Sequence, residues 1–480
     1  MSLEINHSIN VRDLLPKLTR VFEVSAQKIE DLQRTWDPRQ GTPVFTIGGK
    51  YTSRGWTEWT QGFQFGSALL QFDATGAERF LELGRRNTVQ YMASHVSHTG
   101  VHDHGFNNIS TYGNLWRLMR EGKIPTNEQE QNFYELALKV SGAVQAARWM
   151  DLGGGAGYIC SFNGPHSLFV DTLRSLRSLA VAHQLGHVLM GERDRRINLL
   201  QRLITHAVTT ARYSVYYGEA RDAYDVRGRT AHECIFNTKD GSFRCPNTQQ
   251  GYSPFTTWTR GLAWAILGLA EQLEFLSALP DKQIQEVLTW EGEHSSEPGT
   301  EPNLMPRSAR QVRKILVRAA TATADFFIEN TCRDGIPMWD TGAPNLHRLG
   351  NFLAKRADPY NSWEPVDSSA AVIAAQGLVR LSGCLRRQGE TGDAKRYLQA
   401  GLTVADTLFD APYLSVHPKH QGLLLHSVYH RPNGWDFVAR GQKVPNGESS
   451  MWGDYHALEL ALLLLRLAQG HPPLLFFRPP

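Results

Sequence analysis

The stretch DSSAAVIAAQGLVRL, residues 367–381, contains the pattern that decides the fold. Asp367 offers a side-chain oxygen to cap a helix that begins directly after it, and small or apolar residues follow with helical spacing. Helical periodicity recurs along the chain, and no convincing run of alternating residues predicts strands between the helices. The sequence predicts twelve helices, at residues 13–36, 60–73, 76–96, 106–121, 127–150, 168–189, 193–215, 258–277, 307–331, 368–386, 391–409 and 452–468.

Twelve helices with connections of very unequal length favour a single all-α domain over residues 1–480, an (α/α)6 barrel made of six helical hairpins in a toroid. A helical solenoid and a pair of bundles are the alternatives, and the lack of a fixed sequence period weighs against the solenoid. An N-terminal extension at about 1–40 and a polar surface loop at about 278–306 are expected outside the core. Asn163-Gly164-Pro165 is expected to begin the helix at 168–189. The glycine-rich residues 153–157 are expected to form a loop leading to it.

Composition excludes several classes of function. Fifty Lys and Arg residues are balanced by forty-seven Asp and Glu residues, spread along the whole chain, so a nucleic acid is not expected as a partner. Five scattered cysteines without a C-x-x-C pair argue against a disulfide framework or a cysteine zinc site. The start lacks the apolar core of a signal peptide, and the longest apolar run is too short to span a bilayer. We therefore expect a cytoplasmic monomer or homodimer that does not bind membranes.

Two segments place a carboxylate beside a predicted helix. In His102-Asp103-His104-Gly105-Phe106, Asp103 lies at the positive end of the following helix dipole, where it either caps the helix or takes part in chemistry.

Asp171 is the second such carboxylate, within the predicted helix 168–189. On that helix it shares a stripe with the small residues Ser175, Ser178 and Ala182, which would leave room for a ligand. A surface ion pair with Arg174 is the alternative.

The string from Gln250 to Trp264, QGYSPFTTWTRGLAW, combines aromatic and polar side chains at the start of a helix. Arg260 falls in the first turn, where the dipole disfavours a cation, so a bound anion would explain its placement. A guanidinium can hold a carboxylate with two parallel hydrogen bonds. Trp258 and Trp264 offer flat apolar surfaces for a sugar ring. Ordinary aromatic core packing is the alternative for each tryptophan taken singly.

No metal site or cofactor is expected. His183 and His187 are spaced as a helical pair, but Gln184 occupies the position where the H-E-x-x-H motif has its Glu.

These motifs together resemble the unsaturated glucuronyl hydrolases, the enzymes that define glycoside hydrolase family 88. The string at 250–264 is the most specific mark, and H-D-x-G-F at 102–106, the Asp171 segment, DSSAAVIAAQGL at 367–378 and Met451-Trp452-Gly453-Asp454-Tyr455 follow in the family's order. Residues 59–63 also resemble its N-terminal W-x-x-G-F segment. The resemblance covers roughly residues 55–468 and implies an (α/α)6 barrel, in agreement with the helix count.

The resemblance also implies a reaction. Members of this family remove a 4,5-unsaturated uronic acid from the non-reducing end of oligosaccharides left by polysaccharide lyases, by hydrating the vinyl ether. Asp171 would protonate C4 and then accept a proton from the water that adds at C5. Asp103 would be the second essential carboxylate and would help to hold a proton on Asp171. The residues implied to bind the substrate are Trp59, His102, His232, Gln250, Trp258, Arg260 and Trp264.

Departures from the family pattern leave the substrate open. Asp171 is followed by Thr172-Leu173-Arg174-Ser175 instead of an amide- and methionine-rich turn, and Gln249 stands where a histidine is common. The alternatives are a pectin-type unsaturated rhamnogalacturonyl hydrolase, an exo-β-glucuronidase with two carboxylates flanking the glycosidic bond, and a glycan-binding barrel without activity.

Overall fold

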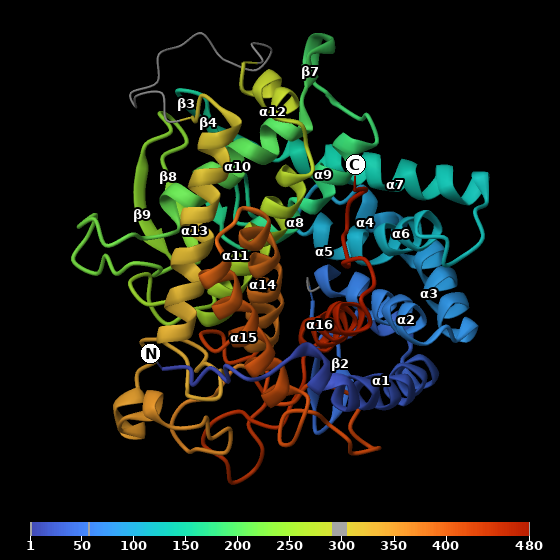
Figure 1. Ribbon diagram of the computed structural model, residues 1–480, viewed down its shortest axis with the longest axis vertical. Helices are drawn as coiled ribbons and strands as arrows, with labels where there is room; N and C mark the ends of the chain where they lie inside the picture. The colour runs from blue at the N-terminus through green and yellow to red at the C-terminus, as the bar shows by residue number, and fades with distance from the viewer. Residues whose placement is uncertain (1, 56–57, 290–304, 480) are drawn as a thin grey trace.

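The computed structural model describes residues 2–55, 58–289 and 305–479, and each of the twelve predicted helices has a counterpart in it (Figure 1). The helices are α1 (Leu15–Thr35), α2 (Gln61–Thr75), α3 (Glu78–Tyr91) with α4 (Ala93–Val96), α5 (His104–Asn108) continued by a π-helical turn (Ile109–Gly113) into α6 (Asn114–Arg120), α7 (Glu128–Ala147), α8 (Thr172–Ser175) with α9 (Arg177–Gln184), α10 (Leu199–Tyr213), α11 (Thr259–Ser277), α13 (Ala309–Glu329), α14 (Ser368–Arg387), α15 (Thr391–Leu408) and α16 (Met451–Gln469).

The helices form two concentric rings. Contacts run around a closed inner ring from α2 to α5, to α8 and α9, to α11, to α14, to α16 and back to α2. The outer helices α1, α3, α7, α10, α13 and α15 pack against this ring, and in Figure 1 α13 lies outside α11 and α3 lies outside α2. The predicted all-α (α/α)6 barrel is therefore confirmed.

Residue type explains which helices lie inside. In α11 every residue from Thr259 to Leu276 is buried, because a helix of the inner ring is covered by the outer ring on one side and by the barrel interior on the other. The outer helix α1 instead buries one stripe that includes Leu18, Val21 and Leu32. Asp367 caps α14 as predicted, accepting hydrogen bonds from the backbone N–H groups of Ser369 and Ala370.

The prediction that strands are absent is wrong. Short antiparallel pairs join the helices: β1 (Phe45–Ile47) with β2 (Lys50–Thr52), β3 (Trp149–Gly153) with β4 (Ala156–Ile159), and β6 (Leu189–Met190) with β7 (Arg196–Ile197). A three-stranded sheet has the order β5 (Ser167–Phe169), β8 (Glu233–Phe236) and β9 (Phe243–Asn247). The expected loop at 153–157 is instead part of the β3–β4 hairpin, in which Gly153 pairs with Ala156 and residues 154–155 form the turn.

The predicted helix at 168–189 is wrong at its beginning. Gly164 has a φ of 117°, a value that glycine adopts readily and other residues rarely adopt. Pro165 follows it in a turn that leads into strand β5 and not into a helix. In β5, Leu168 pairs with Cys234, a partner distant in sequence that local periodicity cannot reveal. The helix predicted at 193–215 likewise begins later, at Leu199, because Asn198 caps α10.

Two peripheral segments also differ from expectation. Residues 15–35 of the expected N-terminal extension form α1, which packs on α16 and α2 as part of the outer ring. The expected loop at 278–306 contains the helix α12 (Asp281–Leu288), and its residues 290–304 lie outside the described ranges.

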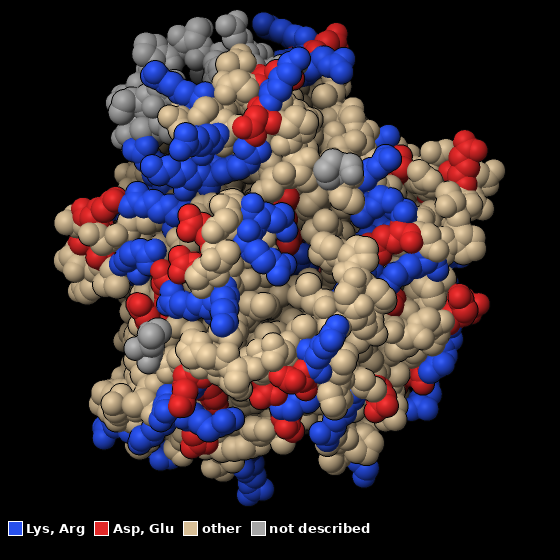
Figure 2. Space-filling model, viewed as in Figure 1, with Lys and Arg blue, Asp and Glu red and all other residues tan. Residues whose placement is uncertain are grey.

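One described helix, α14, is long and apolar enough to cross a membrane, but it is a core helix enclosed by the barrel. On the face shown in Figure 2, acidic and basic side chains are interspersed, and the densest basic group lies over α13. Two of the basic residues of α13, Arg313 and Arg318, pair with Asp281 and Glu219.

Candidate active site

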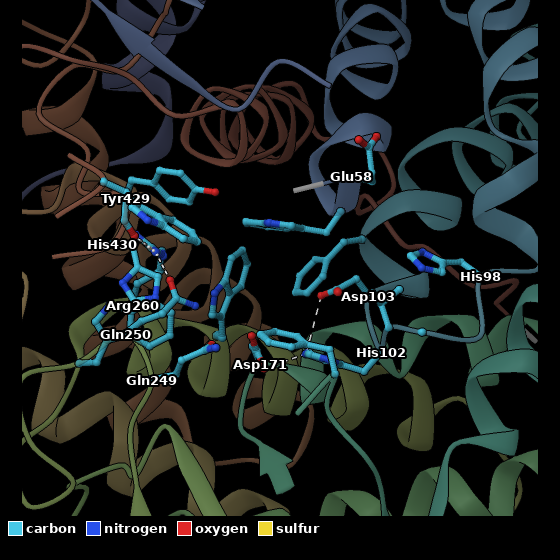
Figure 3. Close-up of a pocket in the computed structure, with 18 residues that line it drawn as sticks. Glu58, His98, His102, Asp103, Asp171, Gln249, Gln250, Arg260, Tyr429 and His430 are labelled. Carbon is cyan, nitrogen blue, oxygen red and sulfur yellow. Dashed lines mark hydrogen bonds and ion pairs between the residues drawn. The ribbon is translucent and has the colours of Figure 1, made fainter. Parts of the chain in front are cut away.

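The N-terminal ends of the inner helices meet at one end of the barrel and surround a cavity of about 510 Å³ (Figure 3). That volume is in the range of pockets that bind small molecules. Eight of the nine predicted site residues line the cavity: Trp59, His102, Asp103, Asp171, Gln250, Trp258, Arg260 and Trp264. Trp59 comes just before α2, and Asp103, Asp171 and Trp258 are the N-cap residues of α5, α8 and α11.

Asp103 and Asp171 approach the same imidazole, that of His102 (Figure 3). The Nε2 atom of His102 lies 3.4 Å from Asp171 Oδ1 and 3.7 Å from Asp103 Oδ1. The imidazole is 1% exposed, stacks against Phe162 at 5.9 Å and meets the edge of Phe169 at 5.5 Å. The site therefore contains two carboxyl groups and one imidazole in a nearly dry setting.

The surroundings set different proton affinities at these three groups. Burial raises the pKa of Asp103 and outweighs the effect of the His102 charge there. Burial acts on Asp171 in the same direction, but the charge of His102 prevails and lowers its pKa. Burial disfavours a charge on His102, yet the two carboxylates raise its pKa. In this arrangement Asp103 holds a proton more readily than Asp171, the reverse of the expected effect of Asp103 on Asp171.

The small residues after Asp171 do not make room for a ligand, so that part of the sequence interpretation is wrong. Ser175 donates to the backbone oxygen of His102 at 2.6 Å and accepts from the N–H of Gly105 at 2.9 Å. A Cβ on Gly105 would lie 2.6 Å from the Cα of Ser175. The stripe instead lets the segments that carry the two carboxylates pack backbone to backbone.

Two local alternatives are also decided. Asp103 makes no side-chain capping hydrogen bond to α5. Arg174 turns away from Asp171 and forms buried ion pairs with Glu271 and Glu459 in the barrel interior. Asp103 therefore does not cap its helix, and Asp171 does not pair with Arg174, so both carboxyl groups are available for another role.

Aromatic rings form the cavity walls. Trp59 stacks on Trp452 at 5.1 Å, and Phe106 meets Trp264 at 5.0 Å. Such rings offer flat apolar surfaces beside polar groups, which suits the C–H faces and hydroxyl groups of a sugar.

The guanidinium of Arg260 is paired with groups of the protein itself. This corrects the expectation that only a bound anion would explain a cation in the first turn of the helix. Its Nη1 atom lies 3.3 Å from Asp367 and also donates to the Val428 oxygen, and its Nη2 atom donates to the Tyr429 oxygen and to Gln250 Oε1, each at 2.8 Å. The side chain is buried between the rings of Trp258 and Trp452. Arg260 thus touches the cavity while it fixes Gln250 and the backbone at 428–429.

His232 is the one predicted site residue that does not line the cavity. It lies behind the wall against Phe169 and Trp258, and its Nδ1 accepts the backbone N–H of Gln249 at 3.1 Å. Burial lowers its pKa to about 4, so the ring is neutral and supports the chain at 249–250.

Sequence reasoning missed other lining residues, among them Gln249, Tyr429, His430 and Trp435. Gln249 was named only as a departure from the family pattern and not as a site residue, and in Figure 3 its side chain points toward Asp171. The other three lie in a long connection before α16 that shows no helical period. Within the described ranges, no group of three or more His, Cys, Asp or Glu side chains is arranged to hold a metal ion.

No family model matches the chain. An unsaturated glucuronyl hydrolase from Bacillus sp. (strain GL1) is 23% identical over 431 residues, which cover 88% of this chain and 90% of the relative. An unsaturated chondroitin disaccharide hydrolase from Streptococcus agalactiae is 22% identical, over 87% of this chain and 84% of the relative. The resemblance seen in the motifs therefore extends across most of the chain and is confirmed.

Solved structures agree in fold. The crystal structure of the unsaturated glucuronyl hydrolase from Bacillus sp. GL1 superposes with a TM-score of 0.67 at 21% identity, covering 96% of this chain and 98% of that one. An unsaturated glucuronyl hydrolase specific for heparin gives a TM-score of 0.68 at 19% identity, covering 95% of this chain and 98% of that one.

Proposed function

We propose, from this relationship to unsaturated glucuronyl hydrolases, that the chain is a glycoside hydrolase that removes a 4,5-unsaturated uronic acid from the non-reducing end of lyase-generated oligosaccharides. The observation that carries the proposal is the pair Asp103 and Asp171, both within 3.7 Å of one buried imidazole nitrogen in an aromatic-walled cavity. A barrel that only binds glycans needs no such proton-exchanging group.

The reaction is hydration of the vinyl ether between C4 and C5. A proton from Asp171 adds to C4, and the positive charge that develops at C5 is shared with the ring oxygen. Water then adds at C5 and gives its proton back to the Asp171 carboxylate. The resulting hemiketal opens to a ketone at C5, which turns the acetal at C1 into a hemiacetal. This hemiacetal collapses to an aldehyde and releases the remaining sugar as an alcohol. The net reaction consumes one water, and the enzyme ends in its starting protonation state.

The polar wall provides a place for the uronate carboxylate. The Oε1 atom of Gln250 is occupied by Arg260, which orients the amide and leaves its Nε2 group as a donor toward the cavity. The uronate carboxylate accepts a hydrogen bond from this amide N–H group. The positive charge of the nearby Arg260 guanidinium, which is hydrogen-bonded to the same amide, stabilises the bound carboxylate. Trp59, Trp258 and Trp264 stack on the sugar. His102 lies at the cavity beside the two carboxyl groups, and His232 acts from behind the wall.

The direct test is to incubate the protein with lyase digests of several uronate polysaccharides. Loss of the ultraviolet absorbance of the conjugated double bond identifies the substrate class. Consumption of unsaturated galacturonyl-rhamnose alone would favour the pectin-type reaction. Cleavage of a saturated glucuronide would favour an exo-β-glucuronidase, and binding of the sugars without consumption of any would leave a glycan-binding barrel.

Replacing the proposed acid gives a sharper prediction. Asp171→Asn is nearly isosteric but cannot deliver a proton, so we expect turnover to fall by about 10²–10⁴-fold or more while the fold is kept. The measurement is the steady-state rate on the unsaturated disaccharide, with circular dichroism as a check of folding. Asp393→Asn on the exposed face of α15 is the matched control. A rate for Asp171→Asn close to that of the control would remove Asp171 from the mechanism.

We also expect a cytoplasmic monomer or homodimer that needs no cofactor.

A further inference from the structure

The imidazole of His102 is buried without an ordinary hydrogen bond. Among the described residues neither Nδ1 nor Nε2 has a hydrogen-bond partner, and Asp171 Oδ1 is in the same condition. A buried polar group left without a partner costs free energy, so such groups are rare unless they serve a function. Two carboxylate oxygens lie near the Nε2 atom of His102, that of Asp171 at 3.4 Å and that of Asp103 at 3.7 Å.

The ring is also held in place. The His102 backbone oxygen accepts hydrogen bonds from Ser175 Oγ at 2.6 Å and from Gln145 Nε2 at 2.8 Å, which tie the loop to α8 and α7. Phe162 and Phe169 contact the imidazole from two directions. The ring therefore stays beside the carboxyl groups.

The charged and titratable groups around His102 come from several elements. Asp103 from its own loop and Asp171 after β5 favour a charge on the ring, and Arg148 after α7 opposes it. His206 on α10 has a pKa lowered by burial to about 3, and His232 before β8 has one lowered to about 4, so both are neutral near pH 7. The two carboxylates therefore outweigh burial and Arg148, and they raise the pKa of His102 above its ordinary value.

The proposed reaction leaves one need unmet, and this inference rests on that reaction. Asp171 must carry a proton when C4 is to be protonated, yet the charge of His102 lowers the pKa of this carboxyl group. We propose that His102 is a positioning residue that stores the proton for Asp171 and takes it back after each turnover, while Asp103 keeps the stored charge in place.

The proton steps balance. When the substrate carboxylate enters, its negative charge favours the neutral form of Asp171, and the proton moves from His102 Nε2 to Asp171 Oδ1. The Asp171 hydroxyl then protonates C4, with the C4–C5 π electrons forming the new C–H bond. The water that adds at C5 loses its proton to Asp171, and that proton returns to His102 Nε2. No oxidant, reductant or further reactant is required.

One test does not depend on activity. In protein labelled with ¹⁵N-histidine, the His102 signals are assigned by their loss in His102→Gln and titrated by NMR. We expect a midpoint above the value of about 6.5 for an unperturbed histidine, and a lower midpoint in Asp171→Asn and in Asp103→Asn. A neutral His102 at pH 6 in the unmodified protein would overturn the inference.

The kinetic test separates storage of a proton from support of the fold. In the unmodified enzyme the shared proton belongs to the His102–Asp171 pair and is lost at a pH that reflects both groups. In His102→Gln only Asp171 holds it. Loss of the His102 charge raises the pKa of Asp171, but a carboxyl group alone should still lose its proton at lower pH than the pair, so the basic limb of the kcat profile should move to lower pH. We expect kcat at neutral pH to fall by about 10- to 100-fold, with KM little changed. His166→Gln, an exposed residue, is the matched control.

A cavity-forming variant adds a rescue. Imidazole added to His102→Ala should restore part of kcat and return the basic limb toward its original position. A folded His102→Gln variant with an unshifted pH profile would overturn the inference even if the enzyme hydrates unsaturated disaccharides. A protonated His102 in a protein that consumes none of them would instead count against the proposed function and leave the charge assignment standing.

Discussion

At the scale of single residues, Arg260 shows how a buried cation can hold a binding wall together. Its guanidinium is paired with Asp367 and donates to two backbone oxygens and to Gln250. We expect Arg260→Ala to lower the free energy of unfolding by about 3–5 kcal/mol, because it leaves a buried carboxylate unpaired. Arg260→Lys should lose less, since it keeps the charge but not the planar fork. Denaturant unfolding measures both changes.

The control for Arg260 is a surface arginine. Arg318 pairs with Glu219 where both side chains are more than half exposed, at 52% and 62%, so Arg318→Ala should cost at most about 1 kcal/mol. If Arg260→Ala unfolds as easily as Arg318→Ala and only KM rises, Arg260 binds the substrate directly and its protein contacts contribute little. The sequence marked Arg260 as unusual, but it could not reveal Asp367, which lies 107 residues away.

At the scale of elements, the close packing of α5 on α8 fixes the distance between the two carboxylates. Gly105 has no Cβ, and one placed there would lie 2.6 Å from the Cα of Ser175, where nothing flexible can yield. We expect Gly105→Ala to force the two segments apart and to lower the free energy of unfolding by about 1–3 kcal/mol. It should also lower kcat, because Asp103 and Asp171 would both shift relative to His102. Thermal unfolding and steady-state kinetics measure the two effects.

Gly383 in α14 supplies the matched glycine control. A Cβ there would meet only the end of the Arg387 side chain at 3.7 Å, so Gly383→Ala should leave the melting temperature unchanged or raise it. If Gly105→Ala and Gly383→Ala had the same melting temperature and kcat, the α5–α8 contact could accommodate a methyl group and would not set the distance between the carboxyl groups.

Elements with strong local signals were predictable, and those built by distant contacts were not. The inner helix α14 was visible from its cap at Asp367 and its apolar period. The segment Leu168-Phe169-Val170 is an apolar run that fits a helix or a strand equally well, and only its pairing with residues 233–235 decides for β5. The wall formed by Tyr429, His430 and Trp435 has no period at all, because its backbone is held by Asp436 and Arg260.

At the scale of the whole molecule, ring closure buries many polar groups together with the apolar core. Histidines that are less than 9% exposed and whose pKa burial lowers to about 3 or 4 occur on both rings and in the cavity wall: His95, His104, His206, His232, His426, His430 and His456. Each is neutral in the fold at pH 5, whereas an unfolded histidine is mostly protonated there.

These histidines predict that the fold loses stability as the pH falls from about 6.5 to about 4. Over this window the unfolded chain binds more protons than the folded one, so the free energy of unfolding decreases by up to about 1.4 kcal/mol per pH unit for each histidine. His102, whose pKa is raised, acts in the opposite direction, as do buried carboxyl groups with a raised pKa, such as Asp340 at about 6. Carboxylates with lowered pKa, such as Asp73 among Arg117, Arg466 and Lys123, lose their contribution only at lower pH, below about 4.

Urea unfolding between pH 7.5 and 4.5 measures this slope. Replacing the fully buried His206 with Gln removes one titrating group, so the free energy of unfolding should fall less steeply as the pH decreases. The variant also loses the hydrogen bond from the Ile159 N–H, which lowers stability at every pH. The exposed His347, replaced in the same way, is the matched surface control. A slope that is the same in His206→Gln and in the unmodified protein would mean that the buried His206 ring takes up its proton without unfolding of the barrel.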